Sequence, residues 1–301
     1  MPHREYNVIS VDDLIKHVES IRREWEPALP WFRGEASDDE YPLTPTLHRV
    51  QPGFHYDENW LLQTFRQEAP ILNLPLLPET GRIDQWMFLA RHVSLPTRLL
   101  DWTEGALIAL NFALRGMDDN EPVPPVVWML NPFKLIGLTP QDPPPLPNIY
   151  PLTWVEQTTS LITDSSIETV DFTDGQERRQ MKVHGEIHDV ALRRNIGLSN
   201  FRAAWSAGPY AYETAYPVPI RPAYVHPRMI AQLSCFTIYG TDHRSLVEML
   251  EGHDCLIKFI IEMPKQETLA QLRTLGVTYV NLMPDADGLA KDILQRYPPA
   301  L

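Results

Sequence analysis

The sequence has few of the features that mark secreted or membrane proteins. Its two cysteines, Cys235 and Cys255, are too few for a disulfide framework and favour buried thiols in a reducing compartment. No apolar run approaches the length of a membrane span, and the first residues lack the apolar core of a signal peptide. We therefore expect a cytoplasmic protein that does not contact a membrane.

Positive charge is also scarce. Lysine and arginine total 26 against 39 acidic residues, which gives a formal net charge of −13. This balance repels a phosphate backbone at long range, so a nucleic-acid partner is disfavoured. A small anionic ligand held by one or two buried arginines remains compatible with the composition.

Proline, by contrast, is abundant at 29 residues, and its clusters predict rigid connections in place of helices. The span 137–215 contains one such cluster and reads as a proline-rich linker and insert. We expect a single domain over 1–301, with an N-terminal half at 25–136 and C-terminal strands and a closing helix at 216–301.

Periodicity and flanking residues predict an α+β fold with N-terminal helices around a mostly antiparallel sheet. A capping-box variant at Ser10–Asp13 opens the first helix. Further helices are expected around Trp60–Ala69, Asp84–Ala90, Ala106–Ala113, Thr268–Leu275 and Leu289–Tyr297, and strands at Trp31–Gly34, Val126–Leu130, Cys235–Tyr239, Leu256–Ile261 and Val277–Leu282.

Standard metal and phosphate motifs are missing from the sequence. His184 and His188 are four residues apart, but Gly185 weakens a helix there and no glutamate is adjacent to the first histidine. No glycine-rich phosphate loop or nucleophile elbow is present. We therefore expect no metal.

Three polar segments interrupt the apolar pattern. The most informative is Arg98–Thr103, where an arginine, a carboxylate and an indole stand together at the entry to an apolar helix. The others are Trp31–Glu35 and Arg228–Gln232. Buried charges need partners, and perturbed polar clusters concentrate at functional sites, so we expect the fold to bring the three segments together.

These segments resemble the FRG domain, a family named for the tripeptide at Phe32–Gly34. The likeness extends to Tyr41–Leu47, Ala90–His92 with Leu95–Thr103, Pro227–Gly240 and Leu282–Ala290, and so covers most of the chain from about residue 25. Arg91 stands where a glutamine is commoner, and Leu233–Ser234 where a glutamine or serine and a glycine are commoner. The family is found chiefly in microbes and their viruses, which leaves room for a defence or toxin role.

A weaker likeness is to the ADP-ribosyltransferase fold, in which an early strand supplies an Arg or His and a later one a Glu or Gln. It implies an ADP-ribosyltransferase-like core that binds NAD as substrate, with Arg33 and Gln232 as catalytic residues. The cofactor-binding residues it implies are Arg33, Gly34, His92, Thr97, Arg98, Asp101, Trp102 and Thr103.

Each of these residues also has a structural interpretation. Arg33 could grip a phosphate or pair with Glu35 or Asp101, and Gly34 would allow a ligand to approach the backbone. Asp101 could cap the following helix and pair with Arg98, with Thr103 as an alternative cap.

Trp102 could stack on a ring or lie in the core, and His92 could titrate or simply pack. Gln232 could orient a ribose but cannot serve as a base, a role left open for Glu213 or Glu262.

Three functions follow. The leading hypothesis is a transferase-like enzyme that cleaves the nicotinamide–ribose bond of NAD and passes ADP-ribose to a protein or another acceptor. The second is a non-catalytic module that binds a nucleotide or a partner through the same arginine-rich cleft. The third is a purely architectural Arg–Asp network. The sequence leaves the acceptor and the oligomeric state open.

Overall fold

A computed structural model describes residues 3–36, 42–49, 56–72, 77–79, 82–116, 123–138, 217–222, 224–240 and 242–297. Seven strands form one mixed sheet in the order β1-β7-β4-β2-β3-β6-β5. β1 pairs with β7 in parallel, and the other five pairings are antiparallel. The strands are β1 (Arg4–Val8), β2 (Trp31–Glu35), β3 (Leu99–Thr103), β4 (Val126–Leu130), β5 (Val218–Ile220), β6 (Ser234–Ile238) and β7 (Leu256–Ile261).

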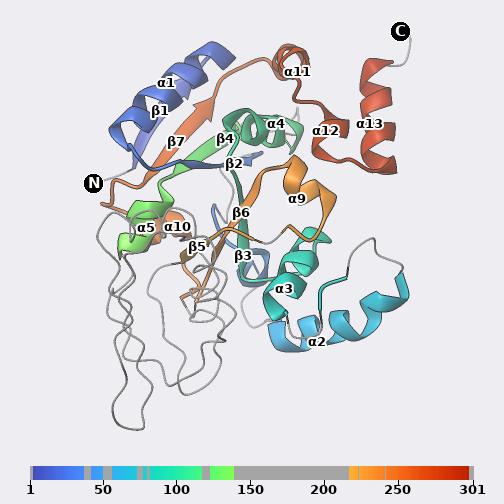
Figure 1. The fold of residues 1–301 in the computed structure, drawn as a ribbon. Helices are drawn as coiled ribbons and strands as arrows, with labels where there is room; N and C mark the ends of the chain where they lie inside the picture. The colour runs from blue at the N-terminus through green and yellow to red at the C-terminus, as the bar shows by residue number, and fades with distance from the viewer. Residues whose placement is uncertain are drawn as a thin grey trace, which may run out of the picture.

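Helices cover both faces of this sheet (Figure 1). Most begin at a side-chain cap: Ser10 Oγ, for example, accepts from the amide of Asp13 at 3.1 Å to start the first helix. The helices are α1 (Val11–Glu24), α2 (Glu58–Glu68), α3 (Ile83–His92), α4 (Ala106–Gly116), α5 (Pro132–Leu138), α9 (Pro227–Ala231), α10 (Leu246–Met249), α11 (Lys265–Thr274), α12 (Tyr279–Leu282) and α13 (Ala286–Arg296), with short 3-10 turns at Thr46–His48 and Ala69–Leu72.

The α+β prediction is confirmed at the level of class, with two corrections. Strands do not gather C-terminally, because β1 to β4 all precede residue 131, and β1, β3 and β5 were not predicted. The apolar run Val277–Leu282, predicted as a strand, instead contains the short helix α12, which Thr278 caps by accepting from the amide of Asn281 at 3.2 Å. Most of the predicted insert 137–215 lies outside the described residues.

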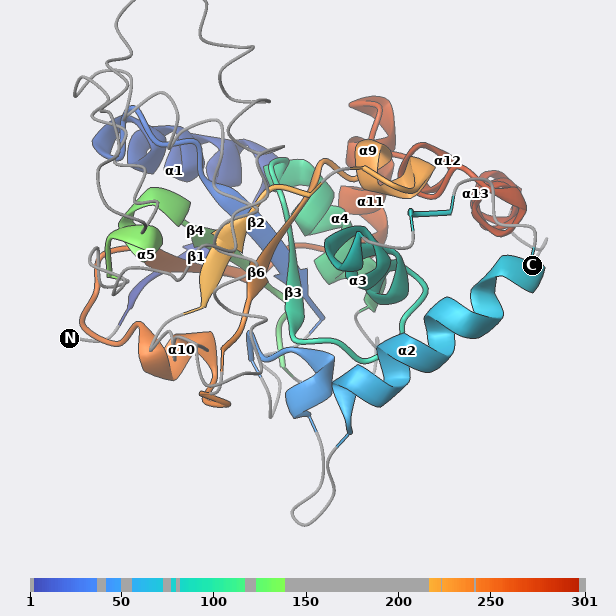
Figure 2. The same ribbon diagram turned by 60° about the horizontal axis from the view of Figure 1, so that its bottom comes forward.

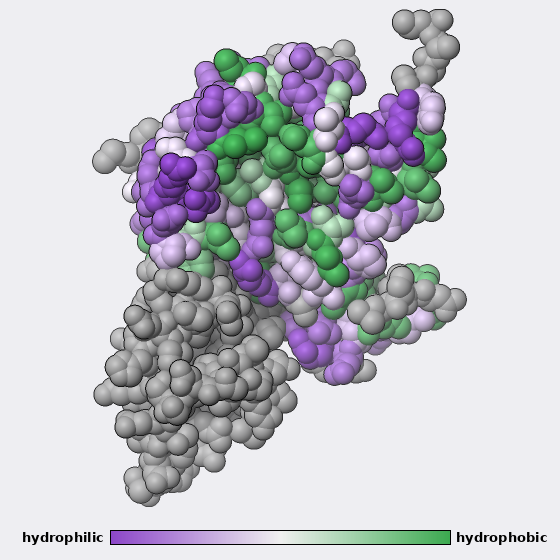
Figure 3. Space-filling view, turned by 45° about the horizontal axis from the view of Figure 1, so that its top comes forward, coloured by the Kyte–Doolittle hydropathy of each residue, from purple (hydrophilic) through white to green (hydrophobic). Residues whose placement is uncertain are grey.

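One part of the core joins α1, α4 and α11 to β7, β4 and β2. α4 lies between α1 and α11, where a hydrophobic strip separates two hydrophilic flanks (Figure 3). Its alanines make this close packing possible: Ala109 and Ala113 are fully buried against β2. At Gly34, an added Cβ would lie 1.9 Å from the carbonyl oxygen of Ala109. The small residues at these positions therefore let α4 pack closely on β2.

A second part of the core lies on the same face, where α3 packs on β3, β6 and β5. Phe88 of α3 stacks on Phe236 of β6 with 5.3 Å between ring centroids. α2 lies outside α3 and extends away from the sheet (Figure 2). The opposite face is covered by α5 and α10 around a cluster that contains Trp31, Trp102 and Trp128. Within the described residues, no helix is long and apolar enough to span a bilayer.

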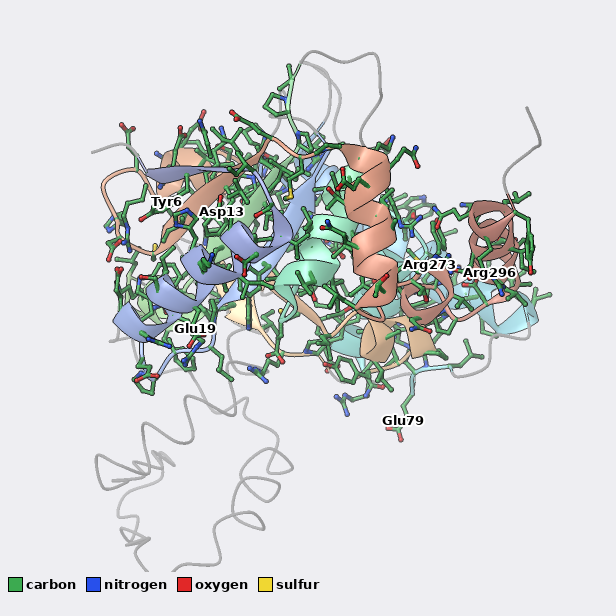
Figure 4. All side chains as sticks on the ribbon, turned by 90° about the horizontal axis from the view of Figure 1, so that it is seen from above. Tyr6, Asp13, Glu19, Glu79, Arg273 and Arg296 are labelled. Atoms are coloured by element: carbon green, nitrogen blue, oxygen red, sulfur yellow. The ribbon has the colours of Figure 1, made fainter. Side chains whose placement is uncertain are left out.

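The C-terminal helices attach to the body mainly through polar contacts. Asp292, 3 % exposed, pairs with Arg273 of α11 at 2.8 Å and with Arg296 at 3.3 Å, and both arginines are labelled in Figure 4. Arg228 of α9 pairs with Asp285, which also caps α13 by accepting from the amide of Gly288 at 2.8 Å. The segment that follows α12 is thereby fixed beside α9.

Candidate functional site

The sheet opens between β2 and β3. These strands share a single register pair, Phe32 with Thr103, whereas β3 and β6 pair over five residues. Beyond that pair the backbone groups of the two strands need other partners. The Nη1 of Arg33 supplies one by donating to the carbonyl of Asp101 at 3.0 Å.

A pocket of about 500 Å³ lies at this opening, between the part of the face covered by α4 and the part covered by α3. It brings together the three segments that the sequence singled out. Its lining includes Arg33, Gly34, His92, Asp101, Trp102, Thr103 and Gln232 among the predicted residues, and Phe32, Glu35, Ala36, Arg49, Arg91, Ser94, Phe112, Gly116, Arg228, Ser234, Phe236 and Met283 in addition.

The pocket carries an alternating chain of charges. Glu35 lies 3.8 Å from Arg49 and accepts from Nε of Arg33 at 2.9 Å. Arg33 is 3.7 Å from Asp101, and Asp101 in turn accepts two bonds from Arg91. This series of charges therefore begins and ends with an arginine, Arg49 at one end and Arg91 at the other.

Asp101 is the more accessible of the two pocket carboxylates. Its side chain is 39 % exposed, against 7 % for Glu35. Burial opposes its charge, but the neighbouring Arg91 and Arg33 outweigh this and hold its pKa below the ordinary value. Both bonds from Arg91 reach Oδ2.

This placement corrects the interpretation of Asp101 as a helix cap paired with Arg98. The run Leu99–Thr103 pairs with β6 as a strand, so Asp101 lies within the sheet. Arg98 instead donates from its Nε to the carboxylate of Glu58 at 2.5 Å. Arg98 is not among the residues that line the pocket. Thr97, 2 % exposed, is not among them either.

Gly34 has a different role from the one predicted. The position of its missing Cβ is filled by the backbone of α4 and not by ligand space, since Ala113 N would lie 2.7 Å away. Trp102 is 3 % exposed and donates to Thr237 at 3.1 Å, which places most of its ring in the core. Of the two roles predicted for Trp102, these contacts support packing, and for Gly34 they show a packing role that was not predicted.

Gln232 forms a wall of the pocket in a fixed orientation. Its Nε2 donates to the carbonyl of Leu282 at 3.0 Å and lies 3.3 Å from the sulfur of Met283. The amide oxygen is then the end left for a ligand. The backbone carbonyl of Gln232 accepts from Thr103 Oγ1 at 2.6 Å. Thr103 Oγ1 in turn accepts from the amide of Gly105 at 3.1 Å. Glu262 does not line the pocket, and Glu213 lies outside the described residues.

Four pocket arginines or carboxylates, Glu35, Arg49, Arg91 and Arg228, were not assigned to the site from the sequence. Arg228 and Glu35 were noticed as members of the polar segments Arg228–Gln232 and Trp31–Glu35, and Arg91 only within a family-like motif. Their role depends on neighbours that are far apart in sequence, as with the contact between Arg91 of α3 and Thr46 at 2.8 Å. No local pattern could have identified it.

Leu233, next to Gln232, has φ of +48°, a left-handed conformation that costs a leucine about 1–2 kcal/mol. Its side chain is 40 % exposed. We expect Leu233→Gly to raise the free energy of unfolding by about 1 kcal/mol in urea titrations, since glycine tolerates this φ. The control is Leu275→Gly, at an exposed position with φ of −81°, which should lose about 0.5–1 kcal/mol. Equal effects at both positions would contradict the prediction.

Comparison with known proteins gives one match. Residues 29–121 match the family model of the FRG domain, a stretch that includes β2, α3, β3 and α4 and therefore much of the pocket. No curated protein and no solved structure matches the chain. The resemblance to the FRG family is thus confirmed, and the likeness to ADP-ribosyltransferases stays a prediction.

Proposed function

We propose that this FRG-domain protein binds a dinucleotide, NAD, in the pocket between α3 and α4. The observation that carries the proposal is charge: among the described residues, four arginines line the pocket against two carboxylates, with Asp285 outside the lining as the partner of Arg228, in a chain whose net charge is −13. Guanidinium groups that converge on a cavity favour phosphate, which they bind through forked hydrogen bonds. A volume of about 500 Å³ is within the range of ligand pockets.

The other lining residues suit the remaining parts of a dinucleotide. Phe112 is half-buried and offers apolar ring surface, whereas Phe32 and Phe236 are almost fully buried and belong mainly to the core. The free amide oxygen of Gln232 and the accessible carboxylate of Asp101 can accept hydrogen bonds from ribose hydroxyls. Each group is held by its own partners before the ligand arrives, which lowers the entropic cost of binding.

Cleavage of the nicotinamide–ribose bond is the reaction that we propose for this site. The bond breaks through an oxocarbenium-like species, so a fixed anion and a fixed dipole near the ribose would stabilise the transition state. Asp101 and Gln232 would supply these, with Arg33 holding phosphate. The acceptor of ADP-ribose would be a protein or water.

A non-catalytic binding module is the second candidate, and one observation favours it. Both pocket carboxylates are paired with arginines, and the lowered pKa of Asp101 makes that carboxylate a weak base. The same cavity could then bind a nucleotide or a phosphorylated partner without turnover.

The first test is thermal denaturation with NAD, followed by analysis for free nicotinamide. At a concentration of 100 times the dissociation constant, NAD should stabilise the fold by about 2.7 kcal/mol. We expect Arg33→Gln and Arg228→Gln to weaken binding by about tenfold or more, because each removes a charged hydrogen-bond donor. Arg22→Gln, which removes the same charge from a pair with Glu19 on α1, should bind normally.

Free nicotinamide would support the enzyme, and binding without product would support the module. No stabilisation at millimolar NAD would exclude the dinucleotide as ligand.

A further inference from the structure

A second group of basic side chains lies at the pocket, beside the ends of α3 and α9. The rings of His92, at the end of α3, and His226, before α9, lie 4.3 Å apart between centroids. His92 and Arg228 line the pocket, whereas His226 contacts it through the ring of His92, and Arg228 also pairs with Asp285. The Nε2 of His92 is buried and has no hydrogen-bond partner among the described residues.

The two histidines differ in what they can do with a proton. Nδ1 of His226 accepts from the backbone amide of Arg228 at 3.3 Å and so caps α9. A protonated His226 would lose that acceptor, because both ring nitrogens of imidazolium are donors. His226 is therefore held neutral, and His92 is the ring that can take up a proton.

We propose that His92, His226 and Arg228 form a subsite for a phosphate group, and that phosphate binding places a proton on His92. The ligand chemistry is a tetrahedral oxyanion, either free or as part of a nucleotide. The identification of the natural ligand as a dinucleotide rests on the function proposed above. The subsite itself does not.

The surroundings explain why an anion is needed for this proton. His92 faces His226, Arg228, Arg91 and Asp101, and His226 faces Arg228 and Asp285. Burial and then the cationic neighbours lower the pKa of His92 to about 4. Among the described residues, Asp101 is the opposing charge on His92, and it is already bound by Arg91. An added oxyanion would reverse this balance and raise the pKa.

Because binding takes up a proton, the affinity for phosphate should depend on pH in a defined direction. The free His92 is neutral at pH 7 and the bound one is protonated, so affinity rises as pH falls from the pKa of the bound state toward about 4. By linkage, one proton changes the dissociation constant by up to about tenfold per pH unit within this window.

The experiment is calorimetric titration with sodium sulfate and, separately, with NAD, between about pH 5.5 and about pH 8. Sulfate and the phosphodiesters of NAD keep their charge over this range, so any proton must come to the protein. Two buffers with different ionisation enthalpies give the number of protons directly. This measurement on the unaltered protein keeps the test valid if a variant fails to fold.

The test variant is His92→Gln, which keeps a donor and removes titration. Its control is His17→Gln on α1, where His17 lies beside the labelled Asp13 and Tyr6 (Figure 4) and away from the pocket lining. We expect the unaltered protein and His17→Gln to bind sulfate more tightly at low pH with proton uptake. Affinity in His92→Gln should change less than about twofold over the range.

The outcomes separate this proposal from the previous one. Sulfate binding with proton uptake but no binding of NAD would support the subsite and reject the dinucleotide. NAD binding with the same affinity at both ends of the pH range would overturn the subsite and leave the proposed function standing. If neither ligand binds, both proposals fail. Proton uptake that persists in His92→Gln would overturn the role of His92.

Discussion

Gly34→Ala should leave little or no folded protein at ordinary temperatures. The added methyl would lie 1.9 Å from the carbonyl oxygen of Ala109 and 2.7 Å from the amide of Ala113. Both are backbone atoms of a helix packed in the core, so neither can move without separating α4 from β2. We expect a loss of at least about 3 kcal/mol in the free energy of unfolding, measured by urea denaturation of soluble material.

Gly105→Ala is the matched control for this substitution. Its added methyl would meet the side-chain tip of Ile108 at 2.9 Å, and that tip can rotate away. A loss below about 1 kcal/mol is expected there. If Gly34→Ala were as mild as Gly105→Ala, β2 and α4 would have to be more loosely packed than the structure has them.

This result bears on the site because Gly34 and Arg33 are neighbours on β2. Side chains alternate along a strand, so Phe32 and Gly34 face α4 while Arg33 faces the other way and reaches Asp101 at the opening of the sheet. Gly34 allows β2 to pack close to α4, and the distance between them fixes the position of the Arg33 guanidinium at the pocket. The tripeptide at Phe32–Gly34 thus combines an apolar contact, a charge that lines the pocket and a close approach to α4.

Much of the local structure could be read from the sequence for simple physical reasons. Val126–Leu130 is continuous, apolar and bounded by prolines, and it is β4 as predicted. The cap at Ser10 and the apolar spacing after it predicted α1. That the segments around Arg33, Asp101 and Gln232 would meet also followed from the cost of burying unpartnered charge.

The errors arose where long-range pairing decides the outcome. Aspartate is a residue type that often caps helices, and Asp101 precedes one. The run Leu99–Thr103 nevertheless gains a full ladder of hydrogen bonds by pairing with β6. Residue type alone predicted an ion pair between Arg98 and Asp101, which are three positions apart. In the fold each has a different partner: Arg98, in the bend before β3, pairs with Glu58, and Asp101, within β3, pairs with Arg91.

Glu35→Ala should cause the second large loss of stability, about 3–5 kcal/mol. Glu35 is 8 % exposed and accepts from Arg33 at 2.9 Å, from the indole of Trp128 at 3.0 Å and from the amide of Leu43 at 3.4 Å. Removing it leaves a buried guanidinium and a buried indole N–H without their acceptor, and each then bears its desolvation cost.

Glu19→Ala provides a control with a similar number of contacts but no burial. Glu19 accepts from Arg22 at 2.8 Å and from Arg23 at 3.2 Å on the exposed face of α1. Exposed ion pairs contribute less than about 1 kcal/mol, so urea denaturation should separate the two variants clearly.

Glu35→Gln makes the charge itself measurable. The amide keeps the shape and one acceptor for Trp128, so we expect a loss of about 2 kcal/mol, smaller than for alanine. It also removes one of the two negative charges that oppose the pocket arginines. Sulfate should therefore bind more tightly to folded Glu35→Gln than to the unaltered protein, even though the fold is weaker. Weaker sulfate binding would mean that Glu35 serves the pocket by positioning Arg33, and that this positioning outweighs its charge.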